Sequence, residues 1–266
     1  MSSLPALTSQ HNPTVKYARS LHQRKIRYRE RALLVEGVRL YLDAIAGGAR
    51  PTLVFLDEER LGREAERVRA AAEGARAYSV TPAVLDAIAD TRTPQGVVAV
   101  FPFPEPPLEL PPGSAPLFIV SDGLQDPGNL GTLTRSALGA GANALFITTA
   151  TVDPFAPKVV RAGMGAQFRL PIRWLDWNEP DPLILACEQL LAARADAPSI
   201  YTQIDWTRPS SIVIGNEVRG ISPRAGALLT GSIAVPLVGG LESLNAGVAG
   251  SIILFEAARQ RRATRA

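Results

Sequence analysis

Polar side chains suited to ligand binding or catalysis gather in three short stretches in the second half of this 266-residue chain: DGLQDPGNLG at 122–131, IGNEVRG at 214–220, and VPL at 235–237 leading into ESLN at 242–245. Each stretch joins an apolar, strand-like run to a glycine-rich turn. An α/β sheet presents functional groups in this way, at the carboxyl ends of its strands. We therefore expect these stretches to carry the chemistry of the protein.

The first stretch and the helix that follows it offer an amide and a guanidinium. Asn129 stands where the N-cap of a helix over 130–139 is expected, because its side chain can accept a hydrogen bond from the first turn. Arg135 lies outside the apolar stripe of that helix, so the core does not require it. A guanidinium there suits bidentate binding of phosphate. A surface salt bridge is the alternative.

The other two stretches offer a carboxylate, a hydroxyl and a second amide. Glu217 follows a buried strand, at the end where ligands bind in open α/β sheets. It could also pair with Arg219 or stabilise the start of a helix. Asn245 is predicted as an N-cap, and Ser243 precedes it with a hydroxyl free for a substrate. Gly247 and Gly250 weaken the helix that follows, so either a backbone or a ligand is expected to pack closely there.

Several classes of site are excluded. The glycine spacing of 123, 128 and 131 fits neither G-x-G-x-x-G nor a P-loop. Two histidines and one cysteine cannot supply the usual zinc ligands, and no metal is expected. Cys187 is predicted to be a buried, unpaired thiol.

The elements that must position these groups form an α/β layer structure. Apolar runs at 117–120, 144–148, 211–214 and 232–235 are typical of parallel strands buried on both faces. Helices are predicted over 130–139, 158–166, 182–193 and 246–259. A smaller α/β domain precedes them, with strands at 33–36, 53–56 and 96–101 and helices over 38–46, over 58–73 and from Pro82.

Domain boundaries follow from proline. Seven prolines between 102 and 116 exclude a helix or a central strand there. The predicted organisation is a first domain over 1–101, a stiff linker over 102–116 and a second domain over 117–266.

Positive charge is concentrated at the N-terminus. Residues 1–39 hold eight lysines and arginines against two glutamates, a net charge of +6 in a chain of +3 overall. This density favours contacts with nucleic-acid phosphates, although a solvated helix face is the alternative. No apolar run spans a bilayer and no secretory signal is evident, so we expect a cytoplasmic protein without membrane contacts.

The ordered set of segments 122–142, 212–222 and 235–261 resembles the SpoU (TrmH-type) RNA 2′-O-ribose methyltransferases of the SPOUT superfamily. Segment 161–172 resembles the family's middle segment, except that Gly163 and Met164 stand where small polar residues are expected. Segment 12–37 is similar to an L30e-like substrate-binding domain. The resemblance implies a mostly parallel α/β sheet with a deep trefoil knot, a homodimer, and S-adenosylmethionine as cofactor.

The resemblance also implies the roles of individual residues. The predicted catalytic residues are Asn129, Arg135, Glu217, Ser243 and Asn245. Cofactor contacts are predicted for Thr148, Gly215, Asn216, Val235, Leu237 and Leu244. Separately from the resemblance, the charge of the basic segment predicts that it binds RNA through Lys16, Arg19, Arg24, Lys25, Arg27 and Arg29.

The predicted reaction is methylation of a ribose 2′-hydroxyl in RNA, with 23S-type ribosomal RNA favoured as substrate. Arg135 is predicted either to activate the hydroxyl or to clamp the phosphate, since an arginine is a poor base. A transfer RNA methyltransferase and a non-catalytic RNA-binding protein of the same fold are the alternatives. The sequence does not name the nucleotide or separate a housekeeping role from antibiotic resistance.

Overall fold

The computed structural model describes residues 4–264, which pack as two compact units. The first unit comprises residues up to 104 together with 155–168, and the second comprises 105–154 and 169 onwards. Residues 103–116 between the two sheets form no helix or strand. Their prolines remove backbone donors and fix φ, so they cannot extend either sheet.

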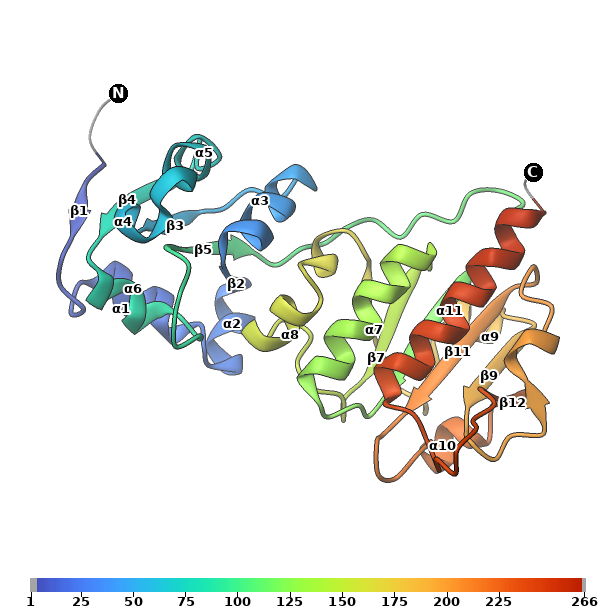
Figure 1. The fold of residues 1–266 in the computed structure, drawn as a ribbon. Coiled ribbons are helices and arrows are strands. Elements are labelled where there is room, and N and C mark those ends of the chain that lie inside the picture. The colour runs from blue at the N-terminus through green and yellow to red at the C-terminus, as the bar shows by residue number, and fades with distance from the viewer. Residues whose placement is uncertain (1–3, 265–266) are drawn as a thin grey trace. The chain divides into compact units, whose positions relative to one another are not determined.

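The first unit is built on a mixed five-stranded sheet of order β1-β4-β3-β5-β2 (Figure 1). Strand β5 pairs antiparallel with both β2 and β3, and the other pairs are parallel. The strands are β1 (Ala6–Leu7), β2 (Ala32–Glu36), β3 (Leu53–Leu56), β4 (Arg76–Val80) and β5 (Val97–Pro102). The helices are α1 (Pro13–Ser20), α2 (Arg24–Glu30), α3 (Val38–Ala46), α4 (Glu58–Leu61), α5 (Ala65–Ala70), α6 (Pro82–Ile88) and α8 (Pro157–Ala162).

The charged helix predicted over 58–73 is interrupted. Helix α4 ends at Leu61, and a 3-10 turn over Gly62–Glu64 leads into α5. Gly62 adopts φ +51°, a conformation outside the right-handed helix, so the helix cannot continue through it.

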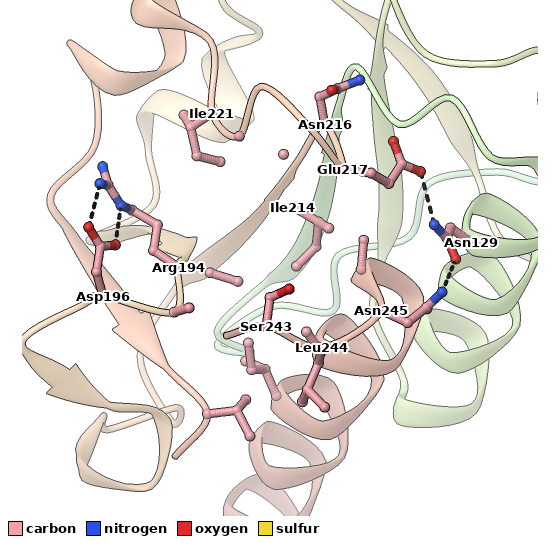
Figure 2. Close-up of a pocket in the computed structure, with 18 of the residues that line it drawn as sticks. Asn129, Arg194, Asp196, Ile214, Asn216, Glu217, Ile221, Ser243, Leu244 and Asn245 are labelled. Atoms are coloured by element: carbon pink, nitrogen blue, oxygen red, sulfur yellow. Dashed lines mark hydrogen bonds and ion pairs between the residues drawn. The ribbon is translucent and has the colours of Figure 1, made fainter. Parts of the chain in front are cut away.

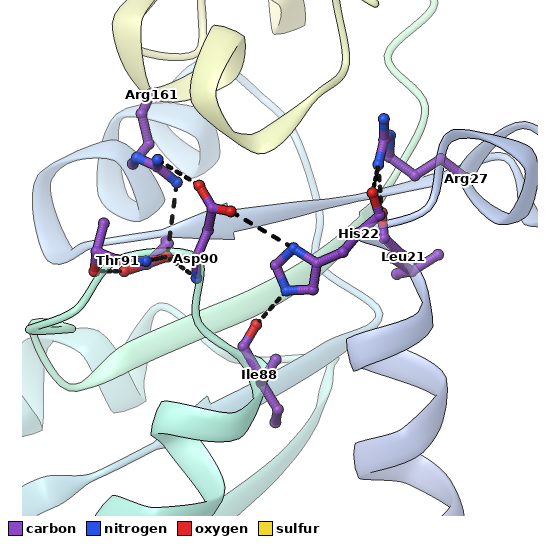
Figure 3. Close-up of polar contacts among 8 residues, drawn as sticks. Leu21, His22, Arg27, Ile88, Asp90, Thr91 and Arg161 are labelled. Atoms are coloured by element: carbon purple, nitrogen blue, oxygen red, sulfur yellow. Dashed lines mark hydrogen bonds and ion pairs between the residues drawn. The ribbon is translucent and has the colours of Figure 1, made fainter.

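Segment 155–168 comes from the middle of the predicted second domain but packs in the first unit. Phe155 stacks against Phe103 with ring centroids 4.4 Å apart, and Val159 and Val160 of α8 are fully buried. Arg161 Nη2 lies 2.6 Å from Asp90 Oδ2 (Figure 3). Aromatic packing and an ion pair therefore hold this segment. Its helix ends at Ala162, four residues before the predicted end.

The second unit contains a sheet of seven strands among the described residues, in the order β10-β12-β9-β11-β6-β7-β8, and every pairing is parallel. The strands are β6 (Leu117–Asp122), β7 (Ala144–Thr148), β8 (Ile172–Leu175), β9 (Gln189–Ala193), β10 (Ser199–Ile200), β11 (Ser210–Gly215) and β12 (Gly231–Ala234). The helices are α7 (Pro127–Ala140), α9 (Pro182–Leu185), α10 (Pro223–Gly226) and α11 (Ala246–Ala263). The predicted parallel, apolar strands are confirmed.

Helices cover both faces of this sheet. Val213 of β11 joins a cluster with Ile184 of α9 and Ala225 of α10. Helix α11 covers the other face (Figure 1), and the next residue, Ile214, packs there, because its Cδ1 would lie 3.3 Å from a Cβ on Gly250 of α11. This alternation follows from the two-residue period of a strand.

The prediction of one helix over 182–193 is wrong. Helix α9 ends at Leu185, and residues 189–193 form β9, which lies between β11 and β12. The apolar run of this segment suits a helix as well as a buried strand. Pairing on both edges decides in favour of the strand, because tertiary hydrogen bonds override local propensity.

Helices α7 and α11 lie side by side on one face of the sheet (Figure 1). A Cβ on Gly250 would lie 2.4 Å from Leu133 Cδ1, and one on Gly247 would lie 3.0 Å from the Asn129 carbonyl oxygen. The close partner expected at these glycines is therefore helix α7.

Candidate active site

A cavity of about 720 Å³ opens where the carboxyl ends of β9, β11 and β12 meet the start of α11 (Figure 2). Its lining comes from segments 193–196 and 214–221, from the segment after β12, and from 243–249, with Asn129 at one side. The volume is within the usual range for a small-molecule site. All three polar stretches of the sequence therefore reach one cavity.

A chain of hydrogen bonds joins the three stretches at this cavity. Asn129 Nδ2 donates to Glu217 Oε1 at 2.9 Å, and Asn245 Nδ2 donates to Asn129 Oδ1 at 2.6 Å. Asn245 Oδ1 in turn accepts from Val248 N at 3.1 Å, as an N-cap does. Because an ionised carboxylate only accepts, the direction of every bond along this relay is fixed.

Asn129 itself is not the N-cap that the sequence predicted. Asp126 caps α7 by accepting from Asn129 N at 2.8 Å, and the helix begins at Pro127. The side chain of Asn129 is therefore free to bridge Glu217 and Asn245.

Glu217 is an acceptor at the end of this relay. Oε1 also accepts from Asp126 N, and Oε2 accepts from Gln125 N, each at 3.1 Å. Partial burial raises the pKa of Glu217, but the bonds from Asn129 and from backbone N–H groups outweigh it and lower that pKa overall. Glu217 is thus held ionised and ties the start of α7 to the loop after β11.

The turn after β11 is shaped by close backbone approach. A Cβ on Gly215 would lie 2.5 Å from the carbonyl carbon of Gly220, so the position admits only glycine. Asn216 and Gly220 exchange two backbone hydrogen bonds of 2.9 Å, and Asn216 Nδ2 donates to the Gly123 carbonyl at 2.8 Å. The first two stretches are therefore locked together beside the cavity.

Most of the predicted cofactor contacts line the cavity. Five of the six residues do so: Gly215, Asn216, Val235, Leu237 and Leu244. Thr148 is buried at the end of β7, where its hydroxyl meets Ser121 O and Thr151 Oγ1 at 3.5 and 3.4 Å, and it does not line the cavity.

The predicted catalytic residues divide in the same way. Asn129, Glu217, Ser243 and Asn245 line the cavity. Arg135 is exposed on α7 and does not. It lies six residues beyond Asn129, about two-thirds of a turn around the helix axis, so it projects from a different face.

The cavity suits S-adenosylmethionine by its lining. Its apolar side chains match an adenine ring, and backbone groups at the Gly215 turn are close by. These apolar side chains include Ile214, Ile233, Val235, Leu237, Leu244 and Ile253. An apolar wall facing convergent polar groups is a usual form of a cofactor site, and polar and charged side chains line the rest of this cavity.

Sequence analysis missed Arg194 and Asp196, which line the cavity as an ion pair. They directly follow β9, the strand that was predicted to be part of a helix. Recognition of that strand would have placed them at a carboxyl end, where ligands bind.

In the first unit, the basic segment is only partly available for RNA. Lys16, Arg19, Lys25 and Arg29 are exposed, and Arg24 lies over the Tyr28 ring. Arg27 is 3% exposed, and its Nη1 donates to the carbonyls of Leu21 and His22 at 2.7 Å (Figure 3). The prediction for Arg27 is corrected: it fixes the α1–α2 connection and presents no charge to a phosphate.

Comparison with known proteins is consistent with this geometry. The SpoU rRNA Methylase family matches residues 116–255, and the MRM3-like substrate binding domain matches 12–99. A Synechocystis protein described as an uncharacterized tRNA/rRNA methyltransferase is 35% identical, with 98% of this chain and 96% of the relative covered. The Bacillus subtilis 23S rRNA (guanosine(2553)-2'-O)-methyltransferase is 29% identical, with 94% and 97% covered.

Solved structures agree over nearly the whole length. The AdoMet-bound rRNA methyltransferase from Sinorhizobium meliloti has a TM-score of 0.81 at 31% identity, with 96% of this chain and 98% of that chain covered. None of the helices within residues 4–264 has the length and apolar character needed to cross a membrane. The matching profile, the similar relatives and the shared fold together show that the chain belongs to the SpoU rRNA methylase family.

Proposed function

We propose that this protein methylates a ribose 2′-hydroxyl in ribosomal RNA, using S-adenosylmethionine. The observation that carries the proposal is the relay from Asn245 through Asn129 to Glu217, which joins the three polar stretches at one cavity. The activity in the name of the Bacillus subtilis relative supports both the reaction and the class of RNA.

When bound, S-adenosylmethionine supplies a methyl group activated by its sulfonium. The chain provides position: the apolar wall holds the cofactor, and the relay fixes the first turns of α7 and α11 beside it. Ser243 is exposed in the cavity, where its hydroxyl is placed to hold a ribose oxygen. Fixing the reactants in this way can lower the barrier by several kcal/mol.

Glu217 does not act as the base in this scheme. Its two oxygens accept three hydrogen bonds and its pKa is lowered, so it is a weak proton acceptor at neutral pH. We propose Arg135 for contact with the RNA, either polarising the 2′-hydroxyl or clamping the adjacent phosphate.

Arg135 can reach this chemistry in a homodimer, which we propose forms through the exposed face of α7 and α11. Val248 and Phe255 of α11 are 43% and 47% exposed there. Ser136, which adjoins Arg135, bonds Ser251 of α11 at 2.7 Å. Sedimentation of the protein and of Phe255→Glu tests this: a dimer that the substitution dissociates supports it, and a monomeric parent refutes it.

The first unit is proposed to hold the RNA through its exposed cations, Lys16, Arg19, Arg24, Lys25 and Arg29. The match to a substrate-binding domain over 12–99 supports this assignment. The domain limits of 1–101, 102–116 and 117–266, a trefoil knot in the second domain and a cytoplasmic location also remain proposals. The match of residues 116–255 to the SpoU rRNA Methylase family supports the knot.

Purified protein incubated with methyl-labelled S-adenosylmethionine and unmodified total RNA tests the function. Size separation, nuclease digestion and nucleoside mass spectrometry should show a 2′-O-methylnucleoside in ribosomal RNA. Label confined to transfer RNA would favour the alternative substrate, and cofactor binding without label in any RNA would contradict the proposal.

Arg135→Ala probes the catalytic assignment in the same assay. We expect methyl transfer to be lost while cofactor affinity stays within a few-fold of the parent, because Arg135 lies outside the cavity. Arg63→Ala in the first unit, at an exposed arginine outside the proposed RNA-binding set, is the control for a general loss of positive charge. A large loss of cofactor affinity in Arg135→Ala would instead assign the residue a structural role.

A further inference from the structure

Arg194 and Asp196 form an ion pair on the wall of the cavity across from the Asn129–Asn245 contact (Figure 2). Arg194 Nε and Nη2 donate to the two carboxylate oxygens of Asp196 at 3.0 and 3.1 Å. Both residues directly follow β9, which lies between β11 and β12 in the sheet. The relay described above does not involve either residue.

Four charged side chains line the cavity among the described residues: Arg194, Asp196, Glu217 and Arg219. The Glu217 carboxylate is already engaged by Asn129 and two backbone N–H groups. Arg219 makes no ion pair with any described carboxylate. Arg194 and Asp196 alone therefore offer neighbouring charges of both signs to a ligand.

The pair is easily opened by a ligand. The side chains of Arg194 and Asp196 are 51% and 73% exposed, and exposed ion pairs contribute little net stability. The hydrogen bond from Arg194 lowers the pKa of Asp196, so the carboxylate is charged at neutral pH. When a ligand supplies one group of each sign, an anion on Arg194 and a cation on Asp196, both side chains stay neutralised.

S-adenosylmethionine carries a zwitterion of matching charge, because its amino-acid end bears an α-carboxylate and an α-ammonium. The geometry points to Arg194 and Asp196 as the subsite for this amino-acid end, with the guanidinium on the carboxylate and the carboxylate on the ammonium. Planar, bidentate recognition of a carboxylate is the contact that arginine makes best. This inference rests on the cofactor occupying the cavity, as proposed above.

Calorimetric titration of the full-length protein with two ligands tests the subsite. S-adenosylhomocysteine retains the amino-acid end, whereas 5′-methylthioadenosine lacks it. In Arg194→Gln and in Asp196→Asn, S-adenosylhomocysteine should bind at least roughly tenfold more weakly, as expected for the loss of a hydrogen bond to a charged group. Affinity for 5′-methylthioadenosine should stay within a factor of about two of the parent, since that ligand has no amino-acid end for the pair to hold.

Two further variants separate recognition from structure. Arg219→Gln removes the other cavity arginine and should leave both affinities unchanged. The exchange Arg194→Asp with Asp196→Arg restores an internal ion pair but reverses the charges, so affinity for S-adenosylhomocysteine should stay weak. Its recovery in the exchanged variant would show a merely structural pair and overturn the inference.

The other possible results of the titration also decide whether the inference stands. Equal weakening of both ligands would place the pair at the adenosine end, and no change in either ligand would leave it a surface ion pair; each result overturns the inference. Leu237→Arg, which introduces a long charged side chain into the apolar wall, should abolish binding of both ligands. If it does not, the cofactor lies elsewhere and the proposed cavity fails, independently of the result for Arg194.

Discussion

Asn129→Asp tests the relay most directly, because it replaces one nitrogen by oxygen with almost no change of shape and adds a negative charge. The Nδ2 group that donates to Glu217 Oε1 at 2.9 Å is removed, and two carboxylates then face each other at that distance. Two like charges about 4 Å apart repel by roughly 4 kcal/mol at an effective dielectric constant of about 20. The destabilisation cannot exceed the cost of protonating one of the two carboxyl groups at pH 7. That cost is about 4 kcal/mol, because pH 7 lies roughly three units above the pKa of a carboxyl group and each unit corresponds to 1.36 kcal/mol.

Solvent near Glu217 reduces this repulsion, so we expect Asn129→Asp to lower the free energy of unfolding by about 2–3 kcal/mol at pH 7. The loss should shrink as the pH falls towards 4, because the introduced carboxyl group, once protonated, can donate to Glu217 again. Urea denaturation followed by tryptophan fluorescence measures the free energy of unfolding of the second unit, since Trp174, Trp177 and Trp206 all lie there.

A double-mutant cycle with Glu217→Gln provides the control. The pair Asn129→Asp with Glu217→Gln removes the repulsion and supplies an amide donor at position 217. Its effect should therefore be smaller than the sum of the single effects. Additive effects, or a loss from Asn129→Asp that does not vary with pH, would refute the view that these side chains form one relay.

Three further predictions concern the pH dependence, the helix contact and the basic segment. The pKa of Glu217 is lowered from its ordinary 4.5, so the ionised Glu217 side chain stabilises the fold above pH 4.5. This stabilisation is lost as the pH falls through the pKa of the folded state. The difference in unfolding free energy between the parent and Glu217→Gln should therefore disappear in acid. Gly250→Ala should cost about 1–3 kcal/mol by the same denaturation, because its Cβ meets Leu133, whereas Gly226→Ala, with open space around it, should cost nothing; equal effects would contradict the close packing. Arg24→Gln with Lys25→Gln should reduce the slope of log affinity against log salt concentration for RNA by about 0.7–0.9 for each phosphate that is no longer bound. Arg27→Gln should leave that slope unchanged and lower the melting temperature, because Arg27 is buried. The reverse pattern would show that Arg27 contacts RNA.

Much of the second unit could be predicted because its signals are local. Continuous apolar runs marked β6, β7 and β11, and Asn245 was predicted as a cap from its place before a helix. Buried parallel strands and N-caps depend on a few adjacent residues, so they are visible in the sequence. Glycines 247 and 250 indicated a close contact, but the sequence could not tell a helix from a ligand.

Errors arose where a local pattern served two structures or a partner was distant. Residues 189–193 were predicted as part of a helix, but they form a strand that is hydrogen-bonded to a neighbour on each edge. Arg27 read as part of a basic surface, yet its guanidinium is buried against two carbonyls. Asn129 was predicted as a cap from its place before a helix. Its contacts with Glu217 and Asn245, 88 and 116 residues away, leave no local sign in the sequence.

By itself the sequence determined which groups this protein brings to its chemistry: three polar stretches, their glycine-rich turns, and the parallel strands that end at them. Only the tertiary structure decided how those groups are used. It joined Asn129, Glu217 and Asn245 into a relay and left Arg135 on another face of α7. It also brought Arg194 and Asp196 to the cavity wall. Strand ends and caps are set by neighbours in the chain, whereas a shared cavity depends on which strands lie side by side in the sheet.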